Sequence, residues 1–167
     1  MLTIQCTKKL MDYINKDISV KPDIQDKLFS WHAHLFIIQR KKYILIMNNQ
    51  SRYNFVLGPL LKKDVKHLDE LIIDGIRDNL KADGIEQSMI DEYLIQVNEF
   101  SYTKTSDRSI IGQINDCIFY VEVIQAADGE LDITKVNRRL NEFVMLKLPL
   151  TYSGRTMIKD LRERFSN

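Results

Sequence analysis

The order of hydrophobic and polar positions predicts a sheet in the first third of the chain. Leu2, Ile4 and Cys6 alternate with polar residues and therefore share one face of an extended segment. Further along, "HAHLFIIQ" and "YILIMNN" are rich in branched and aromatic residues, and the charged "RKK" between them favours a reversal. "RYNFVLG" continues this composition. These segments predict an N-terminal strand and an antiparallel three-stranded meander over residues 32–57.

The middle of the chain is expected to be helical. Hydrophobic residues recur there at the three-and-four spacing of one helix face. This pattern predicts helices near residues 65–82, 86–97 and 106–125. Between the last two helices, a short alternating stretch around residues 99–104 is expected to rejoin the sheet.

The C-terminal part has a weaker pattern. Val136, Leu140, Phe143 and Val144 fall at helical spacing, which favours a helix in that segment. Pro149 then interrupts the chain before a short final amphipathic stretch. No internal repeat or linker divides the sequence.

Together these elements predict the α+β class. We expect a mainly antiparallel sheet, formed by the N-terminal strand and the 32–57 meander and covered by helices. The chain is long enough for one good hydrophobic core or two small ones. We therefore expect a single domain over residues 1–167, with residues 146–167 as a peripheral C-terminal segment.

The composition is that of an ordinary globular protein. Of 167 residues, 44% are hydrophobic and 28% are charged, and the formal net charge is +1. This charge gives no global field that attracts nucleic acid or an anionic membrane. It does not exclude a local basic patch on the surface. The N-terminus lacks the features of a signal peptide, and no apolar run reaches the about 20 residues of a membrane span. We expect no membrane partner.

The cysteine content also bears on location. The only cysteines, Cys6 and Cys117, lie far apart in sequence and match neither a zinc pattern nor a disulfide framework. Both are interpreted as buried thiols in a reducing compartment. We therefore expect a cytoplasmic protein.

Three stretches, taken together, resemble a known family. They are "MLTIQCTKKL", "WHAHLF" with the following "MNNQSRYNFVL", and "TKTSDRSIIGQINDC". On these stretches the chain resembles small bacterial proteins catalogued only as a domain of unknown function, in the same order from residue 1 to about residue 145. The resemblance implies a single α+β bacterial domain. It implies no reaction, cofactor or catalytic residue.

"SWHAHLF" places His32 and His34 on the same face of the expected strand, as a metal or proton-transfer site requires. A zinc site takes three or four protein ligands, however, and the sequence offers no third ligand nearby. His67 lies in a different expected element. We interpret the pair as part of a sheet strand and expect no metal and no cofactor.

The start of the helix at 106–125 is a stronger candidate site. Thr105 or Ser106 is its expected cap, and a helix N-terminus attracts anions through its unpaired N–H groups. Arg108, Gly112 and Asn115 form one stripe with a small residue at its centre. A phosphorylated or nucleotide-like ligand would bind there. The candidate ligand-binding residues are Lys104, Thr105, Ser106, Arg108, Ser109 and Asn115.

The same stripe has a structural interpretation. Arg108 would pair with a carboxylate of the domain, and Gly112 would allow the helix to pack against the sheet. We favour this interpretation for Arg108, because no glycine-rich phosphate-binding loop accompanies it.

The reversal between the first two meander strands is basic. Arg40, Lys41 and Lys42 lie at its tip, with Arg52 and Tyr53 expected nearby on the next strand pair. Basic ribbons with aromatic neighbours can bind nucleic acid, whereas most charged hairpin tips are solvated edges that oppose aggregation. The four basic residues are the candidate nucleic-acid contacts.

Two functions stay open. The sequence has no hydrolase, metalloprotease or P-loop motif, so whether the chain is an enzyme is left undecided. The first hypothesis is a cytoplasmic binding or interaction module without catalytic activity, with an unknown protein or nucleic-acid partner. The alternative is a small enzyme or ligand-binding protein that recognises a phosphorylated or nucleotide-like ligand at residues 108–115. A deep pocket there with another titratable group would favour the alternative.

Overall fold

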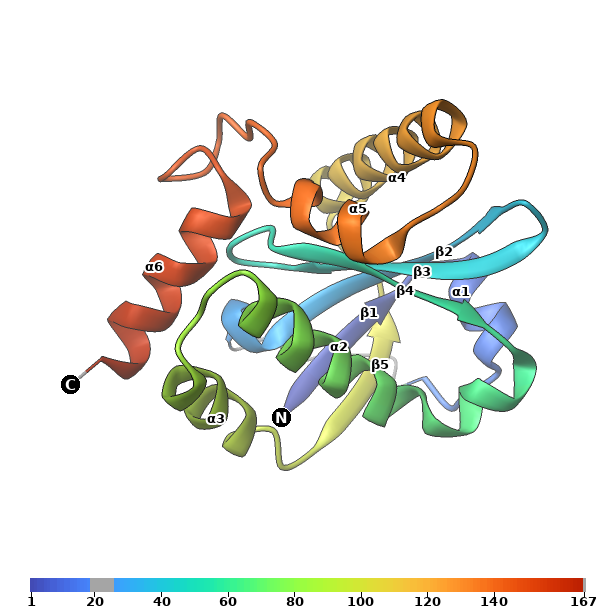
Figure 1. Cartoon of the computed structure of the whole chain (residues 1–167). Helices are drawn as coiled ribbons and strands as arrows, with labels where there is room; N and C mark the ends of the chain where they lie inside the picture. The colour runs from blue at the N-terminus through green and yellow to red at the C-terminus, as the bar shows by residue number, and fades with distance from the viewer. Residues whose placement is uncertain (19–25, 167) are drawn as a thin grey trace.

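A five-stranded sheet lies at the centre of the computed structural model, with helices against both of its faces (Figure 1). The structure describes residues 1–18 and 26–166. The strands are β1 (Leu2–Cys6), β2 (Ser30–Ile38), β3 (Lys41–Asn48), β4 (Asn54–Leu60) and β5 (Phe100–Lys104). The α-helices are α1 (Lys8–Ile14), α2 (Leu68–Ala82), α3 (Gln87–Ile95), α4 (Arg108–Asp128), α5 (Ile133–Leu140) and α6 (Ser153–Phe165). Two short 3-10 helices are η1 (Lys27–Phe29) and η2 (Lys62–His67). The predicted α+β class with a mostly antiparallel sheet is confirmed.

The strands follow the order β4-β3-β2-β1-β5 across the sheet. β2, β3 and β4 pair antiparallel, so the predicted meander is confirmed. β1 pairs in parallel with β2 on one side and with β5 on the other. Parallel neighbours need a crossover connection, and α1 lies between β1 and β2 while α2 and α3 precede β5. The carboxyl ends of β1 and β5 therefore lie at the same end of the sheet.

Alternate residues of the strands fill two cores, one on each face of the sheet. Trp31 and Leu35 belong to the core that α1, α2, α3 and α6 cover, which we call the α2 core. Phe36 and Ile38 belong to the core under α4 and α5, which we call the α4 core. Ile114 of α4 is fully buried there, as the apolar face of this helix predicts.

The start of α4 differs from the predicted one. The helix begins at Arg108 after Asp107, not after Thr105 or Ser106. The Asp107 carboxylate accepts hydrogen bonds from two N–H groups of the first turn, so it supplies the cap. Thr105 instead directly follows β5, and its N–H donates to the Cys6 carbonyl at 3.2 Å.

The C-terminal part contains the last two helices. The predicted helix is confirmed as far as Leu140, where α5 ends, and Val144 instead forms an isolated bridge with Tyr152. Within residues 146–167, α6 places Met157 in the α2 core. The extent of the domain stays a prediction. Among the described residues, no helix combines the length and the hydropathy that crossing a bilayer requires.

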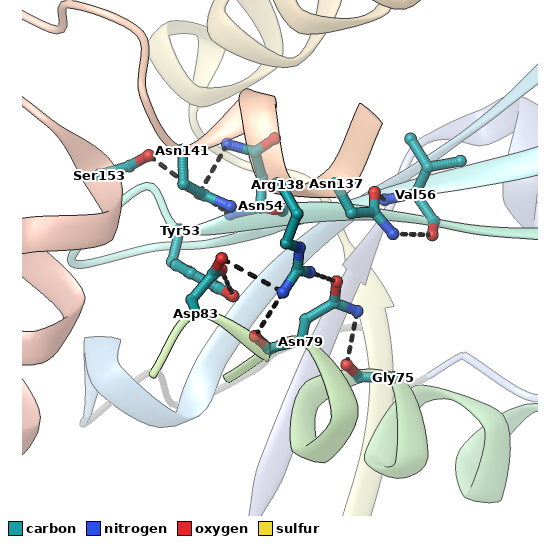
Figure 2. Close-up of polar contacts among 10 residues, drawn as sticks. All are labelled: Tyr53, Asn54, Val56, Gly75, Asn79, Asp83, Asn137, Arg138, Asn141 and Ser153. Atoms are coloured by element: carbon teal, nitrogen blue, oxygen red, sulfur yellow. Dashed lines mark hydrogen bonds and ion pairs between the residues drawn. The ribbon is translucent and has the colours of Figure 1, made fainter. Parts of the chain in front are cut away.

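α5 closes the β4 edge of the sheet with two asparagine side chains (Figure 2). Asn137 accepts from the Val56 N–H at 2.7 Å and donates to the Val56 carbonyl at 3.0 Å. Asn141 makes the same pair of bonds with Asn54, at 2.9 Å and 2.8 Å. Four residues of a helix rise about 6 Å, and two residues of a strand span about 6.7 Å. The two asparagines of α5 are therefore spaced to reach Asn54 and Val56, whose backbone N–H and C=O groups point away from β3. Backbone groups that would otherwise recruit another strand are thereby satisfied.

Arg138, between the two asparagines, ties the same helix to α2. Its guanidinium donates to the Asn79 carbonyl at 3.1 Å and forms an ion pair with Asp83 at 3.2 Å (Figure 2). Tyr53 donates its hydroxyl proton to the same carboxylate. Burial raises the pKa of Asp83, while the bond from Tyr53 and the charge of Arg138 lower it. α5 is therefore held to the sheet edge and to α2 by polar contacts.

Removing one amide tests whether the edge pairing stabilises the fold. We expect Asn137→Ala to lower the free energy of unfolding by about 1–3 kcal/mol, because the buried N–H and C=O of Val56 lose their partner. Urea denaturation measures this loss. Asn115→Ala, at an exposed position of α4, is the matched control and should change stability by less than about 0.5 kcal/mol. Equal effects of the two substitutions would contradict a stabilising role for the amide pair.

Candidate functional site

A polar pocket of about 200 Å³ lies where β1 and β5 end and α4 begins. We call it the His32 pocket. Ile110 and seven polar side chains line it: Gln5, Lys27, His32, Asn49, Arg52, Ser106 and Asp107. Ligands of sheets with parallel strands commonly bind beyond the carboxyl ends of the strands, next to a helix N-terminus. The pocket has this position in the fold.

A chain of hydrogen bonds runs from the end of β5 to His32. Gln5 Nε2 donates to the Ser106 hydroxyl at 3.0 Å and to the Lys104 carbonyl at 3.4 Å. Asn49 Nδ2 then donates to Gln5 Oε1 at 2.7 Å. Asn49 Oδ1 in turn lies 2.7 Å from His32 Nδ1. Gln5 and Asn49 are both buried, so this chain fixes the orientation of every side chain in it.

His32 ends the chain with one ring nitrogen unused. Its side chain is 0% exposed, and Nε2 has no hydrogen-bond partner among the described residues. Because Asn49 Oδ1 can only accept, Nδ1 carries the proton, and Nε2 of the neutral ring is an acceptor. Burial lowers the pKa of His32, while the bond to Asn49 and the charge of Asp107 raise it and Arg52 lowers it. Nε2 is therefore a buried acceptor without a partner among the described residues, in a side chain that lines the pocket.

Two cationic side chains and one carboxylate accompany His32 in the pocket. Arg52 donates from Nε to Gln113 Oε1 at 2.6 Å and from its guanidinium to the Asn49 carbonyl. Its φ is 63°, in the left-handed region that residues other than glycine rarely adopt, so these contacts hold a strained turn after β3. Burial lowers the pKa of Arg52 and the charge of Asp107 raises it. Lys27 is exposed.

The structure brings together only part of the predicted ligand-binding set. Ser106 lines the His32 pocket with its side chain, and Lys104 contributes its backbone carbonyl to the hydrogen-bond chain. Arg108, Ser109 and Asn115 are exposed and do not line this pocket. Thr105 is half-buried and also lies outside the pocket lining.

The structural interpretation of the helix stripe does not describe its observed surroundings. Arg108 is exposed and forms no ion pair within the described part of the chain, so the expected pairing with a buried carboxylate is wrong. Gly112 is also exposed, and a Cβ at this position would meet nothing within 4 Å. Gly112 therefore serves no close helix packing. The stripe points away from the sheet because the buried face of α4 carries Ile110 and Ile114.

His34 shares a face of β2 with His32 but has a separate partner. Its Nδ1 lies 2.7 Å from Thr7 Oγ1. Burial lowers the pKa of His34, and the charge of Lys9 lowers it further. Within residues 1–18 and 26–166, no group of three or more His, Cys, Asp or Glu side chains is placed to hold a metal ion.

The basic residues predicted to contact nucleic acid lie in two places. Arg40 and Lys41 are at the β2–β3 turn, and Lys42 follows in β3, whereas Arg52 follows the opposite end of β3 and lines the His32 pocket. The expected grouping of all four is therefore wrong. Lys42 Nζ lies 5.4 Å from the centre of the Tyr13 ring, and Lys62 Nζ lies 4.6 Å from it. Both lysines thus form cation–π contacts with the Tyr13 ring. Nucleic-acid contact at the β2–β3 turn stays a prediction.

A family model described as Domain of unknown function (DUF6933) matches residues 3–154. The chain belongs to this family. The match confirms the resemblance expected from the sequence, and it includes every residue that lines the His32 pocket of this DUF6933 chain. The comparisons with curated proteins and with solved structures found no match. The family description names no activity, so the proposal for this DUF6933 domain rests on its own side chains.

Sequence patterns missed half of the pocket. Gln5, Lys27, Asn49 and Asp107 were not candidates, although Gln5 and Asn49 orient His32 and Asp107 caps α4. The N-cap pattern could have found Asp107, since an aspartate precedes the apolar helix pattern. No comparable signal marks Gln5 and Asn49, because amides in a strand and a turn are ordinarily solvated.

A larger and mostly apolar groove of about 500 Å³ lies on α4. We call it the α4 groove. Its lining includes Phe119, Tyr120 and Val123 of α4, and Phe143, Val144 and Met145 of the segment after α5. Phe119 is 67% exposed and Val144 is 60% exposed. Such exposed, contiguous apolar side chains commonly mark an interaction surface.

Two histidines of β2, the buried His32 and the half-buried His34, predict how stability depends on pH. Burial lowers the pKa of His32 and of His34 below 6.5, so the folded state favours the neutral rings. Their contribution to stability is present above pH 6.5 and is lost as the pH falls toward the lowered pKa values. We expect the unfolding free energy to fall less between about pH 7.5 and about pH 5 in His32→Gln than in the wild type. Urea denaturation at each pH measures this difference.

His67→Gln is the control, because His67 is exposed at the end of η2. It should keep the pH dependence of the wild type. The same pH dependence in His32→Gln and in the wild type would show that His32 does not titrate differently in the folded state.

Proposed function

We propose that this DUF6933 chain is a binding module for a small oxyanion, such as phosphate or the phosphoryl group of a larger ligand, at the His32 pocket. The observation that supports it is the buried Nε2 of His32, without a partner among the described residues, in a pocket that also holds Arg52 and Lys27. Buried polar groups are ordinarily hydrogen-bonded, so an open acceptor in a charged pocket favours a ligand as its missing partner.

The size of the pocket limits the ligand. Sites for drug-sized molecules measure about 300–1,000 Å³, whereas this pocket measures about 200 Å³. A phosphoryl group with a few water molecules fits this space, since each water takes about 30 Å³ in the liquid. A whole nucleotide would therefore place only one phosphoryl group in the pocket.

The charges favour an anion. Arg52 and Lys27 bring two positive charges, and Asp107 brings one negative charge. Asp107 is also engaged as the α4 cap, where its carboxylate accepts from Ser109 N–H at 2.9 Å. An arginine fork matches the oxygens of a phosphoryl group.

The contacts support binding more directly than catalysis. Gln5, Asn49 and His32 are joined by hydrogen bonds between their side chains. These bonds hold each side chain in one orientation before a ligand binds, which preorganises a binding site. Ser106 and His32 both line the pocket, but no hydrogen bond joins them in the described part of the chain. Both cysteines are free and buried, and burial raises the pKa of each thiol to about 12. We also propose that the protein is bacterial and cytoplasmic, and the buried, unpaired thiols support the cytoplasmic location.

Inorganic phosphate is the simplest probe of the pocket. We expect phosphate at about 100 times its dissociation constant to stabilise the wild type by about 2.7 kcal/mol, which thermal unfolding detects. Arg52→Gln and Lys27→Gln should weaken this effect, because each removes a cation from the pocket. Lys27 is exposed, so its substitution should leave folding intact if Arg52→Gln does not.

Arg108→Gln is the matched control, since Arg108 is exposed outside the pocket. It should keep the phosphate effect and the stability of the wild type. The proposal is wrong if phosphate, sulfate and acetate all leave the wild type unchanged, or if Lys27→Gln and Arg52→Gln respond like the wild type.

The α4 groove favours a second function, the binding of a protein partner. Phe119 is 67% exposed, and Val123, one turn later on α4, is 48% exposed. After Arg108, the charged residues of α4 are all acidic: Asp116, Glu122 and Asp128. We therefore propose that the groove binds an apolar segment flanked by lysine or arginine, as amphipathic helices bind in grooves.

Designed helical peptides test the α4 groove. We expect a peptide with apolar anchors and lysine flanks to bind the wild type about tenfold or more tightly than the same peptide with glutamate flanks. Fluorescence anisotropy measures both affinities. Phe119→Asp should abolish binding, whereas Ile95→Asp, at an 81% exposed residue outside the groove, should preserve it. Equal binding of the two peptides, or loss of binding in both variants, would refute this partner.

A further inference from the structure

The backbone carbonyl of Lys104 determines which way the hydrogen bonds of the His32 pocket point. A carbonyl can only accept, so the Gln5 side-chain atom facing it is the NH₂ group. Gln5 Oε1 therefore faces Asn49 Nδ2, at 2.7 Å. This leaves Asn49 Oδ1 facing His32 Nδ1, also at 2.7 Å, and Nδ1 must donate. The backbone of the fold thus determines the donor and the acceptor in each hydrogen bond of the series, as far as Nε2 of His32.

We infer that the His32 pocket selects an oxyanion that still carries a proton, hydrogen phosphate being the simplest, over a fully deprotonated one such as sulfate. This inference rests on the proposed oxyanion function. Nε2 of His32 is the acceptor for the proton of the ligand. The oxygens without a proton face the cations, Arg52 and Lys27.

A buried acceptor discriminates because it repels an oxygen that has no proton to donate. Sulfate at neutral pH would place a lone pair against the lone pair of Nε2, whereas the P–OH of hydrogen phosphate donates to it. Ligands that lack a hydrogen-bonding group for which a site is built are rejected strongly, because the buried partner is left unpaired. The cations attract both anions, so the selectivity arises at His32.

Burial keeps Nε2 of His32 in its acceptor state at neutral pH. Burial lowers the pKa of the ring and Arg52 lowers it further, while Asp107 and the bond to Asn49 raise it. Lys27, from η1, is the other charged side chain that lines the pocket. Protonation of the ring in acid would turn Nε2 into a donor. Sulfate should then bind more tightly than it does at neutral pH.

Isothermal titration calorimetry of the full chain with inorganic phosphate and with sulfate tests the inference. We expect phosphate to bind about tenfold or more tightly than sulfate at about pH 7.5. Glycerol phosphate distinguishes a free phosphate from a phosphorylated ligand. The second pKa of a phosphate monoester is about 6, so at neutral pH glycerol phosphate has mostly lost the proton that would donate to Nε2. Its affinity for the His32 pocket should therefore rise when the pH is lowered to about 6.

Asn49→Asp tests the role of the hydrogen-bond chain. A carboxylate at this position would favour the protonated ring, so Nε2 would donate and the preference for phosphate over sulfate should largely disappear. Asn115→Asp, at an exposed position outside the pocket, introduces the same charge and should preserve the preference. If Asn49→Asp does not fold, His32→Phe provides the second variant, and it should lose the preference because it has no acceptor.

The outcomes separate the inference from the proposed function. Equal binding of phosphate and sulfate to the wild type would overturn the selectivity and leave an oxyanion site. A preference that persists in Asn49→Asp or in His32→Phe would also overturn it. Failure of both anions to bind would refute the proposed function itself.

Discussion

The parallel pairing of β1 with both of its neighbours is the constraint on which the His32 pocket depends. In parallel strands the carboxyl ends coincide, so Gln5 near the end of β1 lies beside the end of β5 and the start of α4. The same pairing sets Gln5 opposite His32 in the register with β2. An antiparallel β1 would send the end of β5 and the N-terminus of α4 to the other end of the sheet. The position of the site thus follows from strand direction.

Two buried amide systems in the fold differ in what they bind. On the β4 edge, Asn137 and Asn141 each satisfy one backbone N–H and one backbone C=O, those of Val56 and Asn54. In the His32 pocket, the amides of Gln5 and Asn49 are satisfied in sequence, and the chain ends at a ring nitrogen with no partner among the described residues. The first arrangement joins α5 to the sheet edge within the chain. The second leaves one hydrogen-bonding position for something outside the chain.

The sequence predicted the elements of this fold well because their signals are local. The alternation of residues 32–57 and the apolar face of α4 each depend on a few neighbouring positions, and both predictions are confirmed. The direction of β1 depends on its partners, β2 and β5, which lie far along the chain, so its own residues could not show it. The helix cap was misplaced by one or two residues because threonine, serine and aspartate are all good caps.

The site was harder to predict than the fold, because its residues come from four segments that lie far apart in the sequence. The sequence drew attention to His32, Arg52 and Ser106 separately, as parts of three different candidate sites. Only the sheet register shows that these three line one pocket. Gln5 and Asn49 belong to no sequence motif. The role of each amide depends on which neighbouring atoms donate to it and accept from it, and these neighbours are known only from the structure.

The closure of the β4 edge by α5 also affects how the chain is made. Asn137 follows Val56 by 81 residues, so the strand leaves the ribosome well before the helix that covers it. At about 5–20 residues per second, the meander would wait about 4–16 s with an open edge. During that interval the open edge of the nascent sheet is exposed to pairing with other chains.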